Sequence, residues 1–215
     1  RAFQAFLLSN YFITKALVNV RLFYERTGAM TMQIQYQFQK NDEYLTPAYA
    51  VYPITKRLPP GATVWCPFDK VDSAFVQVLS ACGFHVIYGH IQTGQDFFKI
   101  DVPSCDYIIS NPPYSLKSKV IKRLYEIGKP FGMLINFQGI FDCQERFQMF
   151  KHNKVEMLWL SPRVNYIAGN GEAVPRVPFQ SGYLCSGICK NQLEFEYLNK
   201  ENEQESEMKE EQNGS

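Results

Sequence analysis

The fold is decided by the stretch Asp106-Tyr107-Ile108-Ile109-Ser110-Asn111-Pro112-Pro113-Tyr114, an apolar run that ends abruptly in two prolines. The residues from Tyr107 to Ile109 predict a buried strand. Two consecutive prolines cannot continue a strand, because each lacks the ladder N–H and has a fixed φ. The chain must therefore leave the sheet at Asn111, in a stiff loop at the carboxyl end of the strand.

Such a loop is well placed to bind a ligand, because open α/β sheets bind ligands at the carboxyl ends of their strands. It can present two oxygen acceptors, the Asn111 side-chain amide and the Pro112 carbonyl, with the Tyr114 ring as a flat wall. Two acceptors and a stacking face suit a planar group that carries an NH2. The simpler alternative is a structural Pro-Pro turn followed by a surface tyrosine.

Strands and helices alternate along the rest of the chain, which indicates a parallel α/β fold. The predicted strands cover residues 63–66, 84–88, 107–109, 131–137, 155–160 and, as the last strand, 182–189. One predicted helix is capped by Thr46, has Pro47 in its first turn, and is kinked or ended by Pro53. The others cover 73–82, with Asp72 as the cap, 115–127 and 144–152.

Length and composition suit one globular domain, since the chain has 215 residues of which 46% are hydrophobic. Residues 1–32 are expected to form an N-terminal extension, 33–195 the domain, and 196–215 an acidic disordered tail. Lysines and arginines interrupt the apolar N-terminal stretch, so it contains no uninterrupted span of the ~20 residues that a membrane helix needs. We expect a cytoplasmic protein.

Charge and cysteine content narrow the class of protein further. The net charge is +1, and the acidic tail leaves the rest mildly cationic, which permits nucleic acid as a partner without requiring it. The six cysteines are scattered and contain no CxxC pair. They predict free buried thiols in a reducing compartment and argue against a zinc site or disulfides.

Asn-Pro-Pro-Tyr after an apolar strand resembles the catalytic motif of amino-methyltransferases that use S-adenosylmethionine, chiefly the small phage-type N6-adenine DNA methyltransferases. The resemblance implies a Rossmann-like class I methyltransferase fold, with a mostly parallel central sheet and helices on both faces. It implies a site-specific, adenine-specific DNA methyltransferase that acts on a base flipped out of the duplex. Asn111, Pro112, Pro113 and Tyr114 match the catalytic residues, of which two supply acceptors and the aromatic stacks on the base.

The resemblance also covers segments that bind the cofactor in this family. It implies these cofactor-binding residues: Tyr44, Thr46, Pro47, Cys66, Pro67, Phe68, Asp69, His90, Asp96 and Phe97. The loop that starts at Cys66 departs from the family pattern, because its acid is displaced and the glycines are missing. His90 stands where an acid commonly binds the ribose hydroxyls. Asp96 matches an acid that accepts from the cofactor's adenine, with a surface Asp before two core Phe as the alternative.

Cationic and late residues are the candidates for binding the substrate: Lys117, Lys119, Arg163, Asn165, Tyr166 and Arg176. Two of them lie on the helix 115–127 next to the motif, where they can neutralise phosphates, although a solvated charged face is the usual meaning of such a pattern. The others belong to residues 161–181, a long segment without predicted regular structure, and such segments are usually functional or mobile. The segment resembles the late part of phage-type enzymes, where an aromatic helps to hold the base.

Three alternatives share these features. Enzymes that methylate the side-chain amide of glutamine carry the same motif, because their acceptor is also a planar NH2. Adenine in RNA presents the same amino group as adenine in DNA. The missing glycines also allow a non-catalytic module that binds nucleic acid or a protein partner.

Overall fold

The computed structural model describes residues 44–168 and 177–199, and the predicted extension 1–32 therefore lies outside the described residues. The strands are β1 (Tyr44–Leu45), β2 (Thr63–Cys66), β3 (His85–Tyr88), β4 (Tyr107–Ser110), β5 (Phe131–Asn136), β6 (Glu156–Ser161), β7 (Ile167–Ala168), β8 (Ser181–Ser186) and β9 (Leu193–Tyr197). The α-helices are α2 (Tyr52–Thr55), α3 (Ala74–Ala81), α4 (Lys117–Ile127) and α5 (Gln144–His152). Short 3-10 helices are η1 (Ala48–Ala50), η2 (Ile91–Thr93) and η3 (Tyr114–Leu116).

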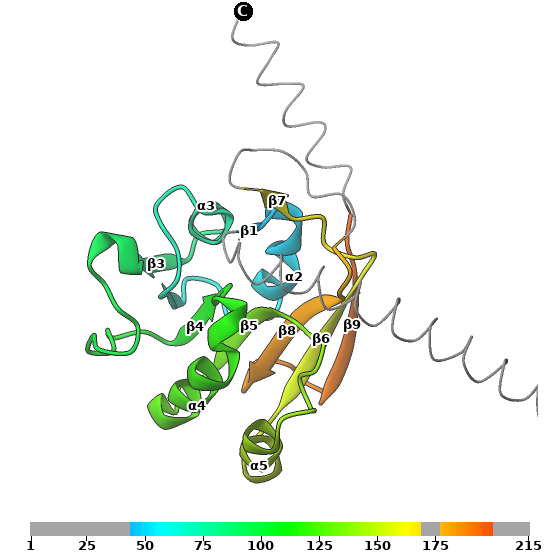
Figure 1. Ribbon diagram of the computed structural model, residues 1–215. Helices are drawn as coiled ribbons and strands as arrows, with labels where there is room; N and C mark the ends of the chain where they lie inside the picture. The colour runs from blue at the N-terminus through cyan, green and yellow to red at the C-terminus, as the bar shows by residue number, and fades with distance from the viewer. Residues whose placement is uncertain (1–43, 169–176, 200–215) are drawn as a thin grey trace, which may run out of the picture. The chain divides into compact units, whose positions relative to one another are not determined.

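The centre of the fold is a seven-stranded sheet with the order β3-β2-β4-β5-β8-β6-β9 (Figure 1). Neighbouring strands are parallel except around β8, which runs antiparallel to both β5 and β6. The sheet is thus mostly parallel and mixed. This confirms the predicted α/β class and is compatible with a Rossmann-like fold.

Helices cover both faces of this sheet (Figure 1). Successive side chains of a strand point to opposite faces, and the core divides accordingly into two clusters. Val64 and Cys66 of β2 pack in the cluster that contains residues of α2 and α3. Trp65, which lies between them, packs in the cluster that contains residues of α4 and α5. β2 therefore supplies side chains to both layers of the core.

The helix starts show where sequence patterns were correct and where they were wrong. The predicted helix 144–152 coincides with α5. In α3 the cap is Ser73, not Asp72, because Ser73 has the extended backbone directly before the first turn and its hydroxyl accepts from the Val76 N–H. The helix predicted from Thr46 is two short pieces, η1 and α2. A proline inside one long helix would break its hydrogen bonding, and Pro53 lies instead in the first turn of α2.

The strand β9 is an element that the sequence analysis did not predict, and it runs two residues past the predicted domain end at 195. Its apolar side chains point outward, with Phe195 70% exposed. Its acidic side chains point toward the turn that follows α2, where Arg57 Nε donates to Glu194 Oε2 at 2.8 Å and Arg57 Nη1 donates to Glu196 Oε2 at 3.1 Å. The usual polarity of an edge strand is thus reversed. From residue 200 onward the predicted acidic tail lies outside the described residues.

Candidate active site

The predicted motif lies at the point where the strand order of the sheet reverses. From β2 the chain proceeds to β3 on one side, and then crosses to β4 on the other side. The carboxyl ends of β2 and β4 therefore lie at a topological switch point, which is where open α/β sheets bind ligands. The first loop contains Phe68 and Asp69, and the second contains Asn111 and Tyr114.

Asn111 directly follows β4, as the two prolines predict, and its two amide atoms differ in their surroundings. The Nδ2 atom donates to Thr46 Oγ1 at 3.1 Å. The Oδ1 atom is buried and has no hydrogen-bond partner within residues 44–168 and 177–199. A buried acceptor without a donor costs about 1–3 kcal/mol. An acceptor held in this state is available for a donor from a ligand.

A short ribbon formed by β1 and β7 anchors the motif from two sides. The strands pair antiparallel. β1 leads directly into Thr46, which accepts from Asn111, while Tyr166 directly precedes β7 and accepts from Tyr114. The ribbon thus connects residues more than 100 positions apart and attaches both to one loop. Tyr44, a predicted cofactor residue, lies in β1.

The Tyr114 ring is held by other aromatic side chains. Its hydroxyl donates to the Tyr166 hydroxyl at 2.8 Å. The ring is nearly perpendicular to Phe179, at a centroid distance of 5.7 Å, and to Tyr166, at 6.4 Å. Tyr114 is half-buried, whereas Tyr166 is fully buried, and this burial raises the pKa of Tyr166 to about 12. Tyr166 is therefore a neutral support for Tyr114 and does not face solvent.

The two prolines keep the motif extended. Pro112 is buried, and Pro113 has φ −56° and ψ 125°. The Pro113 carbonyl accepts from the Leu116 N–H at 3.1 Å and thereby starts η3. The loop accordingly has little freedom between the end of β4 and the start of α4, as its sequence predicts.

The loop after β2 packs closely against the motif. Cys66 and Pro67 are buried, and the half-buried Phe68 ring contacts the Phe97 ring at a centroid distance of 4.8 Å. The Asp69 carboxylate accepts from the hydroxyl of Ser110, the last residue of β4. Burial raises the pKa of Asp69 to about 6, although hydrogen bonds from Ser110 and Ser73 oppose the shift. The displaced acid is thus directed at the motif strand.

The other predicted cofactor residues have local partners. Phe97 is buried against Trp65 and Phe68. Asp96 Oδ1 accepts from the Phe98 N–H at 3.0 Å, and this bond, helped by Lys99, lowers the pKa of Asp96. His90 Nδ1 accepts from the Gln92 N–H at 3.1 Å and so caps η2. Pro47 is buried at the start of η1.

The two lysines predicted to contact phosphates, Lys117 and Lys119, differ in their surroundings. Lys117 Nζ donates to the backbone carbonyl of Asn136 at 3.0 Å, to the Asn136 Oδ1 at 2.8 Å and to the Gln138 carbonyl at 3.3 Å. Burial, together with Arg146, lowers the pKa of Lys117 to about 8. Lys117 therefore fixes the end of β5, while Lys119 is exposed on α4.

The late residues from the predicted substrate set are mostly at the surface. Arg163 and Asn165 are exposed, and the backbone N–H of Asn165 donates to the Tyr49 hydroxyl at 2.7 Å. Arg176 lies outside the described residues. The backbone contact to Tyr49 ties the segment before β7 to η1, next to Thr46.

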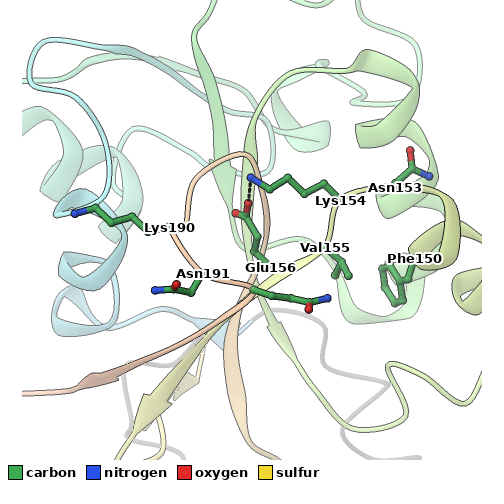
Figure 2. Close-up of a pocket in the computed structure, with 8 residues that line it drawn as sticks. Phe150, Asn153, Lys154, Val155, Glu156, Lys190 and Asn191 are labelled. Carbon is green, nitrogen blue, oxygen red and sulfur yellow. Dashed lines mark ion pairs between the residues drawn. The ribbon is translucent and has the colours of Figure 1, made fainter.

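A pocket of about 230 Å³ lies at the opposite edge of the sheet, near the amino end of β6 (Figure 2). It is lined by Phe150, Asn153, Lys154, Val155, Glu156, Lys190, Asn191 and Gln192. Glu156 accepts from the N–H groups of Gly187, Ile188 and Cys189, and Lys154 contacts it at 2.5 Å. These contacts hold the turn between β8 and β9. No predicted site residue lines this pocket.

No model of a known protein family matches the chain, and no curated protein matches it either. Within the part of the chain that the structure describes, no group of three or more His, Cys, Asp and Glu side chains could hold a metal ion. In the same residues, no helix is both long and apolar enough to cross a membrane. All six cysteines are free, and four of them are buried.

Sequence reasoning missed two residues that complete the site. Ser110 is fully buried beside Asp69, and Phe179 packs against Tyr114. A signal existed for Ser110, because a polar side chain at the end of an otherwise apolar strand needs a partner when it is buried. No local pattern could identify Phe179 as the neighbour of a residue 65 positions earlier.

Proposed function

We propose that this protein transfers a methyl group from S-adenosylmethionine to the N6 amino group of adenine in DNA. The observation that carries the proposal is the Asn111 Oδ1 atom, a buried acceptor without a donor among the described residues, at the switch point of a mostly parallel sheet. An exocyclic amino group supplies the missing donor. The class I methyltransferase form of the Rossmann-like fold is part of this proposal.

The switch point at the carboxyl ends of β2 and β4 is where the methyl donor would bind. The half-buried Phe68 ring, which packs on the buried Phe97, would supply an aromatic wall there, and Thr46 lies next to the motif. When bound, S-adenosylmethionine supplies an electrophilic methyl group on a sulfonium. Asn111 directly follows β4 at the same end of the sheet, so in this proposal the acceptor amine and the methyl donor would meet there.

The chemistry follows from the properties of the amino group. Its lone pair is delocalised into the adenine ring, which makes the nitrogen a poor nucleophile. Hydrogen bonds from the two N–H groups to Asn111 Oδ1 and to the Pro112 carbonyl favour the pyramidal nitrogen of the transition state. The N–C bond forms as the C–S bond breaks, and the nitrogen then releases one proton to water. No base is needed before the methyl group is transferred.

Tyr114 would hold the flipped base by stacking, which contributes about 1–3 kcal/mol per base in single-strand binding. That gain offsets part of the few kcal/mol that flipping a base costs. The bond from Tyr114 to Tyr166 and the contact with Phe179 keep the ring in one orientation. A preoriented ring loses little conformational freedom when the base arrives.

The test is incubation of the full chain with radiolabelled S-adenosylmethionine and, in separate reactions, unmethylated DNA, RNA and a glutamine-containing protein. We expect labelled N6-methyladenine from DNA and none after the substitution Asn111→Ala. If the label appears in RNA adenine or in glutamine instead, DNA is the wrong substrate, and the proposed chemistry of the Asn-Pro-Pro-Tyr motif still holds. If the wild-type chain labels no substrate and shows no heat of binding with millimolar cofactor, the chain is a non-catalytic module.

A further inference from the structure

We propose that the hydrogen bond between Asp69 and Ser110, the Asp69–Ser110 bridge, positions the catalytic motif against the loop after β2. Asp69 and Ser110 are positioning residues, because they act through Asn111 and Phe68. The role of the bridge in catalysis rests on the proposed function. Its role in holding the two loops together can be measured without any activity.

The Ser110 hydroxyl is used in both directions. It donates to the Asp69 carboxylate and accepts from the Phe68 N–H at 3.3 Å. Ser110 is fully buried, and Asp69 is 6% exposed. The Asp69 backbone N–H donates in turn to the Gly89 carbonyl at 3.0 Å. One buried hydroxyl thus joins the loops at the switch point of the sheet.

The position of Ser110 in the chain gives the bridge its influence on the site. Ser110 is the residue directly before Asn111, and the prolines after Asn111 leave the loop little freedom. Phe68, which donates to Ser110, contacts Phe97 in the proposed cofactor wall. A change in the bridge therefore alters the distance between the amide of Asn111 and the cofactor loop. A misplacement of about 1 Å can lower a rate about 100-fold.

The surroundings of Asp69 indicate that its carboxylate serves as an acceptor. The hydroxyls of Ser73 and Ser110 hydrogen-bond to it, and the neutral Cys66 thiol of β2 and Tyr183 phenol of β8 interact with it electrostatically. No cation among the described residues forms an ion pair with it. An amide oxygen can accept the same hydroxyl. Asparagine is thus the conservative replacement, and alanine removes the acceptor.

The kinetic experiment compares Asp69→Ala, Ser110→Ala, the double variant and Asp69→Asn, with Asp72→Ala as the control from the same loop, since Asp72 is exposed. We expect each single alanine variant to lower kcat about 100-fold with a KM for DNA within about threefold of wild type. The kcat of the double variant should be less than about threefold below that of either single alanine variant, because the two residues act through one bond. Asp69→Asn should restore most of the loss. The proposal would be overturned if the loss of kcat in the double variant equalled the product of the two single losses, or if Asp69→Asn lost as much kcat as Asp69→Ala.

The second readout is amide hydrogen exchange of the full chain without substrate. The Phe68 N–H loses its acceptor in Ser110→Ala, so its exchange should accelerate at least about tenfold, while amides in the centre of β5 keep their protection. Unchanged exchange at Phe68 would show that the bridge does not hold the loop. If wild type transfers no methyl group but Phe68 responds as expected, the proposed function fails and the bridge stands.

Discussion

The Asn111 side-chain nitrogen donates to Thr46 Oγ1 across 3.1 Å, and the oxygen end of the same amide is the one left for a ligand. Here the threonine hydroxyl accepts from the nitrogen, while the amide oxygen is buried without a partner among residues 44–168 and 177–199. The two residues are 65 positions apart and meet because the β1–β7 ribbon places Thr46 beside the motif.

Replacing Thr46 with valine tests this orientation. Valine keeps the shape of threonine but removes the acceptor, so the amide of Asn111 loses the contact that fixes it. We expect kcat for methyl transfer to fall about fivefold, since one hydrogen bond of about 1 kcal/mol no longer favours the productive orientation. Steady-state kinetics measure the effect. The control is Thr55→Val in α2, and an equal loss in both variants would contradict the role of Thr46.

Replacing Asn111 with alanine separates a catalytic asparagine from a structural one. We expect methyl transfer to disappear, while cofactor binding measured by calorimetry changes little. The free energy of unfolding should stay within about 1 kcal/mol of wild type, because the lost bond to Thr46 is balanced by removal of an unpaired buried oxygen. A loss of stability well above that value, together with substantial residual transfer, would assign Asn111 a structural role.

The raised pKa of Asp69 predicts a specific pH dependence of stability. Its value is about 6 in the folded protein and 3.8 without the protein environment, so the folded state binds more protons between these values. The free energy of unfolding should therefore fall as the pH rises through this window, by about 3 kcal/mol in total. Above about pH 6 the loss is complete.

Denaturant unfolding between about pH 4 and pH 8 measures this dependence, because the linear extrapolation gives the free energy at each pH. The informative quantity is the difference between wild type and Asp69→Asn, which cancels the other titrating groups. Asparagine does not ionise, so the variant should gain stability relative to wild type as the pH rises. A difference that is constant with pH would contradict the raised pKa.

Glu156 should stabilise the fold without affecting the Asn-Pro-Pro-Tyr motif. Its buried carboxylate accepts three backbone N–H groups of the turn between β8 and β9 and contacts Lys154. Replacing it with alanine leaves those donors unpaired and should lower the free energy of unfolding by about 3 kcal/mol. Thermal or denaturant unfolding measures the loss, with the exposed Glu126→Ala as the control. An unchanged midpoint would show that the turn holds without it.

The sequence by itself determined the local parts of this protein. Two prolines after an apolar run end β4 at Ser110, and the spacing of apolar residues defines α5 and most of α3 and α4, because these effects depend on neighbours within a few residues. The alternation of strands and helices was enough to predict a parallel α/β fold, and the resemblance added helices on both faces of the sheet. The Pro-Pro corner was likewise predictable in position and stiffness.

Tertiary structure alone decided the partners across the sheet. It placed β8 antiparallel between β5 and β6, turned the acidic face of β9 toward Arg57, and bound the half-buried Lys117 to the end of β5. It also brought Asp69 to Ser110, 41 positions away, and Tyr114 to Tyr166, 52 positions away. Such contacts depend on which strands become neighbours, and a hydrogen-bond donor in the sequence does not specify which distant acceptor the fold will bring to it.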